Sequence, residues 1–140
     1  MLLFAALLLA QTAPCTAKDA NLPAPLSAWT APGERLAIGT AKLLKTDHTE
    51  FGKHPGYTTA TSFDVTQAGV YGVALNQPGW IDVFPELDGS AALPSVAHGH
   101  GPECSTIRKI VRFRLVPGKY KLTIVGMPAA DAKAMLVAGE

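Results

Sequence analysis

Charged residues are scarce in this chain, and neither sign prevails. They make up 16% of the 140 residues, with 12 Lys and Arg against 11 Asp and Glu. Such a near-neutral chain presents no broad field to a polyanion, so we expect no nucleic-acid partner. Long apolar runs are also lacking. The most extended one, residues 1–10, has about half of the ~20 residues that a transmembrane helix needs, so we expect no membrane span.

Residues 1–10 have the form of a secretory signal peptide, because an uncharged apolar stretch is followed by small residues. No Lys or Arg precedes this stretch, so only the α-amino group supplies positive charge. Cleavage after Ala10 would leave Cys15 in the mature chain, whereas cleavage after Ala17 would remove it. The sequence therefore predicts a periplasmic or secreted protein whose signal peptide ends at residue 10, or as late as residue 17.

Cysteine is nearly absent, and the two that occur are Cys15 and Cys104. In an exported chain, two cysteines most simply form one disulfide. This bridge would close a loop of about 90 residues, for which the reduced entropy of the unfolded chain predicts about 4–5 kcal/mol of stabilisation. If the signal peptide is cleaved after Ala17, Cys104 is instead a lone thiol.

Turn-forming residues are abundant, with 13 Gly and 11 Pro. Together with the low charge, this composition is typical of a β protein rather than of a helical enzyme. Residues 11–33 are rich in proline and show no period, so we expect an extended segment that Trp29 docks on the body. Residues 34–140 are predicted to form a single all-β domain, an antiparallel, jelly-roll-like β-sandwich.

Apolar residues that alternate with polar ones predict the individual strands. Strands are expected near residues 36–44, 61–66, 70–75, 80–84, 106–116, 119–125 and 129–137, with a loop over 45–59. Pro117-Gly118 suits the two central positions of a type II turn, so the strands beside it are expected to form a hairpin. Their predicted core residues are Val111, Phe113, Leu115, Leu122 and Ile124. The alternation breaks at Lys109 and Ile110, which suggests a β-bulge.

Several segments carry resemblances to known families. FDVTQAGVY (residues 63–71), WID (80–82) and LVPGKYKLTI (115–124) resemble the strand and turn pattern of bacterial pre-peptidase C-terminal-like β-sandwich domains, over roughly residues 60–137. The N-terminal cysteine, GWIDV (79–83), VAHGHGPECSTIRKIV (96–111) and KAMLV (133–137) together resemble small exported alphaproteobacterial proteins. Some of these are labelled homogentisate 1,2-dioxygenase, which implies a ring-opening enzyme with non-haem iron.

The run HGHGPEC, residues 98–104, concentrates the side chains that could carry chemistry. On a strand, His98 and His100 would point to the same side, as adjacent metal ligands do, and Glu103 or Cys104 could supply a third donor. Two histidines and a carboxylate form the donor set of oxygen-activating iron sites, so one alternative is a site for Fe, Zn or Cu. The glycines and the proline make the run a turn-rich loop, however. We favour a structural role in which the histidines bond to loop carbonyls, Cys104 forms the disulfide and no cofactor is bound.

Four cations follow within seven residues: Arg108, Lys109, Arg112 and Arg114. At alternating positions they would line the outer face of a strand. They could form an anion-binding patch, although a solvated face or the protection of an edge strand is the more common reason for such a run.

Asp82 lies beside Trp80 in an otherwise apolar strand. A carboxylate in this setting could orient a histidine. More often it accepts a hydrogen bond from a backbone amide or from an arginine such as Arg108.

These patterns predict an exported β-sandwich that serves as a non-catalytic binding or structural module, with a protein or glycan partner that they do not identify. The chain has no Ser–His–Asp order, phosphate loop or CxxC motif. The alternative is a small metal-binding protein or an iron dioxygenase-like enzyme centred on His98 and His100. A third possibility is a domain that pairs with a larger partner at an exposed strand edge.

Overall fold

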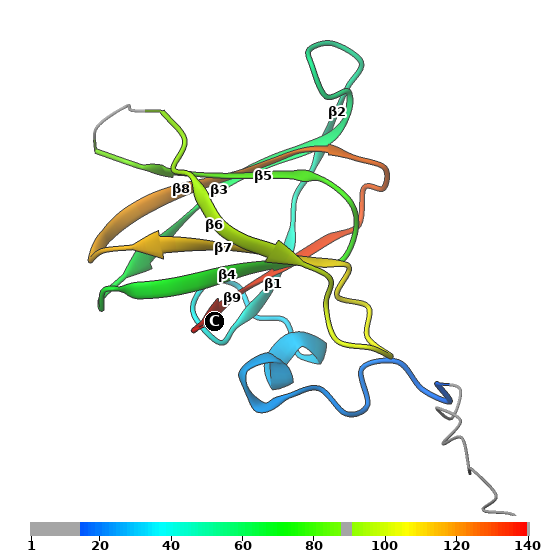
Figure 1. The fold of residues 1–140 in the computed structure, drawn as a ribbon. Helices are drawn as coiled ribbons and strands as arrows, with labels where there is room; N and C mark the ends of the chain where they lie inside the picture. Colours follow the sequence, from blue (N-terminus) through cyan, green and yellow to red (C-terminus); the bar gives the residue numbers. More distant parts are fainter. Residues whose placement is uncertain (1–14, 88–90, 140) are drawn as a thin grey trace, which may run out of the picture.

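The computed structural model describes residues 15–87 and 91–139. In these residues the chain forms two antiparallel sheets that enclose one core, together with a short 3₁₀ helix, η1 (Ala24–Thr30) (Figure 1). The predicted all-β sandwich in a single domain is confirmed. The expected signal peptide, residues 1–10, and the first part of the N-terminal segment, residues 11–14, lie outside the described residues.

The two sheets contain five and four strands, in the orders β1-β9-β4-β7-β6 and β2-β3-β8-β5. The strands of the first are β1 (Ala41–Leu44), β9 (Ala132–Ala138), β4 (Gly69–Leu75), β7 (Lys109–Leu115) and β6 (Ser95–Gly99). Those of the second are β2 (Asp47–Thr49), β3 (Gly56–Val65), β8 (Gly118–Met127) and β5 (Trp80–Pro85). The alanine-rich tail is thus a strand, as predicted.

The core lies between the sheets and follows the alternation in the sequence. The residues predicted to face inward are all buried: Val111, Phe113, Leu115, Leu122 and Ile124. Phe63 of β3 stacks on Tyr120 of β8, with 5.6 Å between the ring centroids. Burial of each such side chain contributes about 1.5–3 kcal/mol, so the alternating strands supply most of the favourable free energy of folding.

The two strands beside Pro117 do not pair with each other. β7 pairs with β4 and β6, whereas β8 pairs with β3 and β5 in the other sheet. The predicted hairpin is therefore wrong, and residues 116–117 form an arch that crosses between the sheets. Gly118 has a φ of 156°, far from the roughly 80° that a type II turn requires. Alternation specifies which side chains face the core, but it is the same for a hairpin and for an arch.

Two of the connections that cross between the sheets are arches that each carry a tyrosine bonded back to its own connection. One arch joins β7 to β8, and the other joins β3 to β4. The hydroxyl of Tyr120 donates to the carbonyl of Val116 at 2.7 Å, and that of Tyr71 donates to the carbonyl of Gln67. Tyrosine corners of this kind occur in β-sandwiches, where they satisfy backbone groups that no sheet partner reaches.

Two further local predictions differ from the structure. Residues 45–59, predicted as a loop, contain β2 and the start of β3. The prediction failed because this short polar pair of strands shows no apolar alternation. The expected bulge at Lys109 and Ile110 is absent, since β7 pairs continuously with β4 there. The irregular register lies instead in β6, between Ser95 and Ala97.

Two amide side chains fix the connection between β8 and β9. Gln77 is buried, and its amide bonds to the backbone N–H of Ala129 at 2.8 Å and to the carbonyls of Ala129 and Asp131. Asn76 binds the carbonyl of Asp131 and the N–H of Lys133 in the same way. These contacts replace the strand pairing that this connection lacks.

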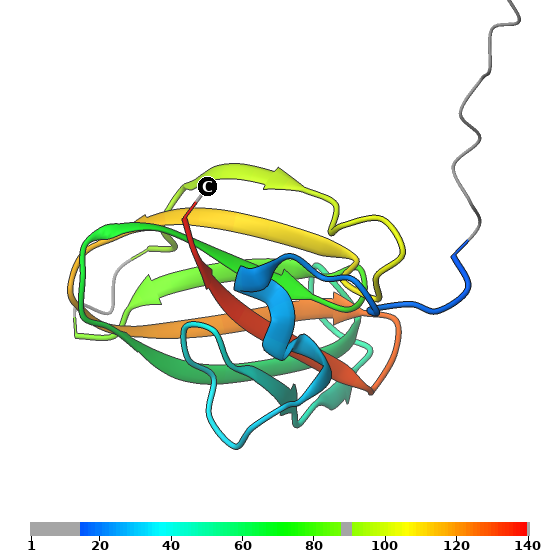
Figure 2. The same cartoon turned by 90° about the horizontal axis from the view of Figure 1, so that it is seen from below.

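A second hydrophobic cluster lies on the outer face of the five-stranded sheet, beneath η1. Figure 2 shows η1 lying against β9. Leu26 and Trp29 of the helix pack with Ala41, Ala74, Ile107, Ile110, Met135 and Val137. Trp29 is fully buried, so the predicted docking is confirmed, but η1 replaces part of the segment predicted as extended. In residues 15–87 and 91–139, no helix has the length and apolar character needed to cross a membrane.

Candidate functional site

A disulfide attaches the N-terminal segment to the loop that joins β6 to β7. The predicted bridge between Cys15 and Cys104 is present, with 5.5 Å between the Cα atoms. Disulfides persist in oxidising compartments, so the bridge indicates a non-cytoplasmic location. We refer to residues 100–107 as the cross-linked loop. Because its cysteine is oxidised, that sulfur is neither a free thiol nor a thiolate ligand.

Hydrogen bonds reinforce this attachment on both sides of the bridge. The carboxylate of Asp19 accepts hydrogen bonds from the backbone N–H and the hydroxyl of Thr106, at 2.7 and 2.6 Å. The same hydroxyl oxygen accepts the indole N–H of Trp29 at 2.9 Å. The backbone N–H of Asp19 donates to the carbonyl of Cys104 at 2.8 Å. The docking of Trp29 is predictable from the sequence, whereas no local pattern marks Asp19 and Thr106 as partners.

The structure places His98 within β6, opposite Val111, and His100 immediately after it. Both histidines and Glu103 are exposed. Among residues 15–87 and 91–139, no three His, Cys, Asp or Glu side chains are placed together as metal ligands. Glu103 therefore does not join His98 and His100 in a metal-ligand cluster.

His100 bonds to Arg108 rather than to a loop carbonyl. Its Nδ1 lies 3.1 Å from Nη1 of Arg108. A guanidinium only donates, so Nδ1 must accept and the ring carries its proton on Nε2. The positive charge of Arg108 beside the imidazole opposes the approach of a metal cation.

The four predicted cations do not form one patch. Arg112 and Arg114 lie on the outer face of the five-stranded sheet, where Nε of Arg112 donates to the carbonyl of Gly139 at 3.3 Å. Lys109 has the opposite parity, and its Nζ donates to the carbonyl of Gly79 at 2.7 Å. Burial, and secondarily the charge of Arg108, lowers the pKa of Lys109 below its ordinary value.

The histidines and the first two cations meet at one pocket of about 260 Å³. We call it the basic pocket, and it is lined by Pro78, His98, Gly99, His100, Arg108 and Lys109. Each of its ionisable side chains is a cation or an imidazole, and no Asp or Glu is among the lining residues. The pocket thus brings the histidine run and the first two residues of the cation run together.

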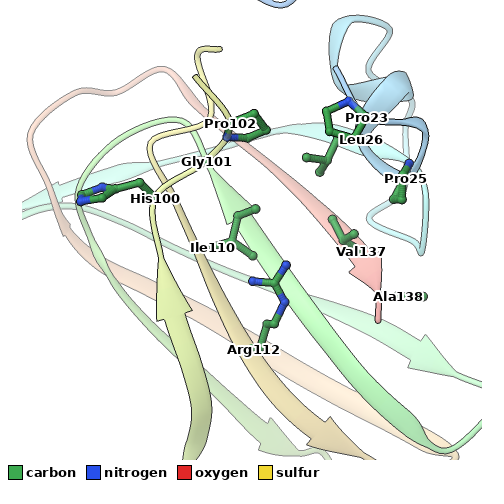
Figure 3. A pocket seen from close by; sticks show the side chains of 10 residues that line it. All are labelled: Pro23, Pro25, Leu26, His100, Gly101, Pro102, Ile110, Arg112, Val137 and Ala138. Carbon is green, nitrogen blue, oxygen red and sulfur yellow. The ribbon is translucent and has the colours of Figure 1, made fainter. Parts of the chain in front are cut away.

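A second pocket, of about 360 Å³, lies between η1 and the cross-linked loop (Figure 3). We call it the proline pocket, and it is lined by Pro23, Pro25, Leu26, His100, Gly101, Pro102, Ile110, Arg112, Val137 and Ala138. In Figure 3 the ring of His100 points away from the other lining side chains. His100 therefore borders both pockets.

Asp82 and Trp80 lie on β5, in the other sheet. Asp82 is exposed, and no side-chain hydrogen bond within the described ranges joins it to a histidine or an arginine. Trp80 is 59% exposed and stacks on His54, with 4.3 Å between the ring centroids. The stacking was not predicted, because His54 belongs to the segment interpreted as a polar loop.

Comparison with known proteins finds no matching family model, no matching curated protein and no matching solved structure.

Proposed function

We propose that this protein is an exported, non-catalytic binding module whose ligand site is at the cross-linked loop. The observation that carries the proposal is the double attachment of this loop, through the Cys15–Cys104 bridge and through Asp19, Thr106 and Trp29. These bonds hold the walls of two adjoining pockets before any ligand arrives. Preformed concave sites bind ligands with little ordering cost, which is the property that a binding protein needs.

Three side chains of the loop that could perform chemistry are engaged in structural bonds, whereas Glu103 is exposed. Cys104 is oxidised, and the hydroxyl of Ser105 donates to the carbonyl of Pro102 at 2.6 Å. Nδ1 of His100 accepts from Arg108. This use of potential nucleophiles, bases and ligands supports binding rather than catalysis. The disulfide and the apolar residues 1–10 support a periplasmic or secreted location.

The proposal is tested by screening a library of small fragments against the oxidised, tag-free protein with ¹H–¹⁵N NMR spectra. We expect shift changes to concentrate at residues 98–102 and 108–112. Thr106→Val, which removes one attachment of the loop, should weaken these responses. Fragment responses confined to other surfaces, such as the β2–β3 edge, would contradict the assignment of the site.

The metalloprotein alternative is tested by elemental analysis of the same preparation. We expect chelator treatment to leave the melting temperature unchanged, and Fe(II), Zn(II) and Cu(II) not to raise it. The metalloprotein alternative would be supported by a stoichiometric metal that raises the melting temperature of the wild type. Both His98→Ala and His100→Ala should then lose this effect, because the loss of either ligand would abolish the site.

A further inference from the structure

The basic pocket brings together hydrogen-bond donors from two strands and the loop between them. Arg108 and Lys109 contribute a guanidinium and an ammonium, and His98 contributes an imidazole. His100 contributes a second imidazole, whose Nε2–H is the donor left free because Nδ1 accepts from Arg108. Four neighbouring side chains thus offer donors around a volume of about 260 Å³.

The positive charge of this pocket is not neutralised from within. Its lining contains no carboxylate, and the two cations are adjacent in the chain. The lowered pKa of Lys109, caused by burial and then by Arg108, reflects the cost of holding an ammonium in these surroundings. An anion placed between the two cations would reduce this cost.

Both cations are held in place before an anion arrives. Nζ of Lys109 bonds to the carbonyl of Gly79 at 2.7 Å, which leaves two of its three N–H groups available. Arg108 uses one N–H group on His100, and its backbone N–H donates to the carbonyl of Leu75 at 2.8 Å. Little side-chain entropy therefore remains to be lost on binding.

We infer that the basic pocket binds the oxoanion group of a small ligand, a carboxylate, phosphate or sulfate, between Arg108, Lys109 and the two imidazoles. This inference rests on the proposed binding function and names its ligand chemistry. An oxoanion accepts several hydrogen bonds at once, and a guanidinium presents paired donors that match two of its oxygens. The pocket volume lies just below the usual range for drug-sized ligands, which suits a single anionic group rather than a polyanion.

The experiment titrates the oxidised, tag-free protein with inorganic phosphate, sulfate and acetate in separate arms, with sodium chloride holding the ionic strength constant. Binding is followed by ¹H–¹⁵N NMR. We expect saturable shifts at residues 98–100 and 108–109 in at least one arm, and the arm with the lowest dissociation constant identifies the anion class. Arg108→Gln should weaken binding at least tenfold.

Arg114→Gln is the matched control, because it removes the same charge at a position on β7 that lies outside the basic pocket. It should change the dissociation constant less than twofold. His98→Ala, at an exposed position, should weaken binding several-fold and serves as a second variant if Arg108→Gln fails to fold.

Two outcomes would overturn the inference. One is the absence of saturable shifts in all three arms, and the other is an equal loss in Arg108→Gln and Arg114→Gln, which would show a general charge effect. If neutral fragments still bind at the cross-linked loop, the proposed function stands and only the anion assignment fails. If neither fragments nor anions bind there, both fail.

Discussion

The indole of Trp29 donates its hydrogen bond to the hydroxyl oxygen of Thr106 at 2.9 Å, across 77 positions in the sequence. The same hydroxyl donates to the carboxylate of Asp19. One small side chain therefore satisfies the polar atom of a fully buried tryptophan and also holds a charged group of the N-terminal segment. Through these two bonds, Thr106 links η1 and the N-terminal segment to the cross-linked loop.

Thr106→Val keeps the shape of this side chain but removes both hydrogen bonds. The variant leaves the indole N–H of Trp29 without its partner, and we expect a loss of about 1–3 kcal/mol in the free energy of unfolding. Urea denaturation provides the measurement. Thr106→Ser retains the hydroxyl and should lose much less. Equal losses in the two variants would show that the methyl group, not the hydroxyl, stabilises the contact.

Reduction of the Cys15–Cys104 bridge should destabilise the protein by about 2–5 kcal/mol, because the unfolded chain regains the freedom of a long loop. The melting temperature, recorded with and without a reducing agent, measures this effect. In the double variant Cys15→Ser/Cys104→Ser the two melting temperatures should coincide. A wild-type protein that melts at the same temperature in both states would refute a stabilising role.

The sequence predicted the strands better than their partners. Alternation identified Val111, Phe113 and Leu115 as core residues, because burial on one face of a strand imposes a period of two. It could not show that Pro117 begins a crossing between sheets, since this depends on which strands lie on either side in the folded sandwich. A local pattern carries no information about such neighbours.

Because local patterns do not reveal neighbours in the fold, the candidate site was also predicted only in part. The histidine run and the cation run were both recognised as unusual, and the disulfide was predicted correctly. Their union in the basic pocket depends on the hydrogen bond between His100 and Arg108, eight residues apart. Asp19, 87 residues from Thr106, could be identified only once the fold was known.

Gln77→Leu should be strongly destabilising although leucine is similar in size. The substitution removes the amide that bonds to Ala129 and Asp131 and leaves backbone groups in this part-buried connection without partners. We expect a loss of about 2–4 kcal/mol in urea denaturation, since each unsatisfied buried group costs about 1–3 kcal/mol. Gln67→Leu is the control, because the side chain of Gln67 is exposed and only its backbone carbonyl bonds to Tyr71. A similar loss in both variants would contradict the role assigned to the amide.

Because of Lys109, the stability of the protein should vary with pH in the alkaline range. Its pKa is lowered in the folded protein from the ordinary 10.5, so the unfolded state binds more protons between the two values. The contribution of this residue to the free energy of unfolding is therefore lowest at a pH below the folded pKa. It rises with pH between the folded pKa and 10.5, and it is constant above 10.5.

Urea denaturation of the wild type and of Lys109→Gln, from about pH 8 to about pH 11, isolates this contribution, because the other lysines and the tyrosines titrate in both proteins. The difference in stability between the two should shift in favour of the wild type as the pH rises. A difference that stays constant over the range would refute the lowered pKa.

The surface that receives η1 includes Met135 and Val137, which belong to the last strand, β9. This surface is therefore complete only after the final strand has joined its sheet. We expect the N-terminal segment to dock on it late in folding. In that case the Cys15–Cys104 bridge would lock a sandwich that has already assembled, rather than direct its formation.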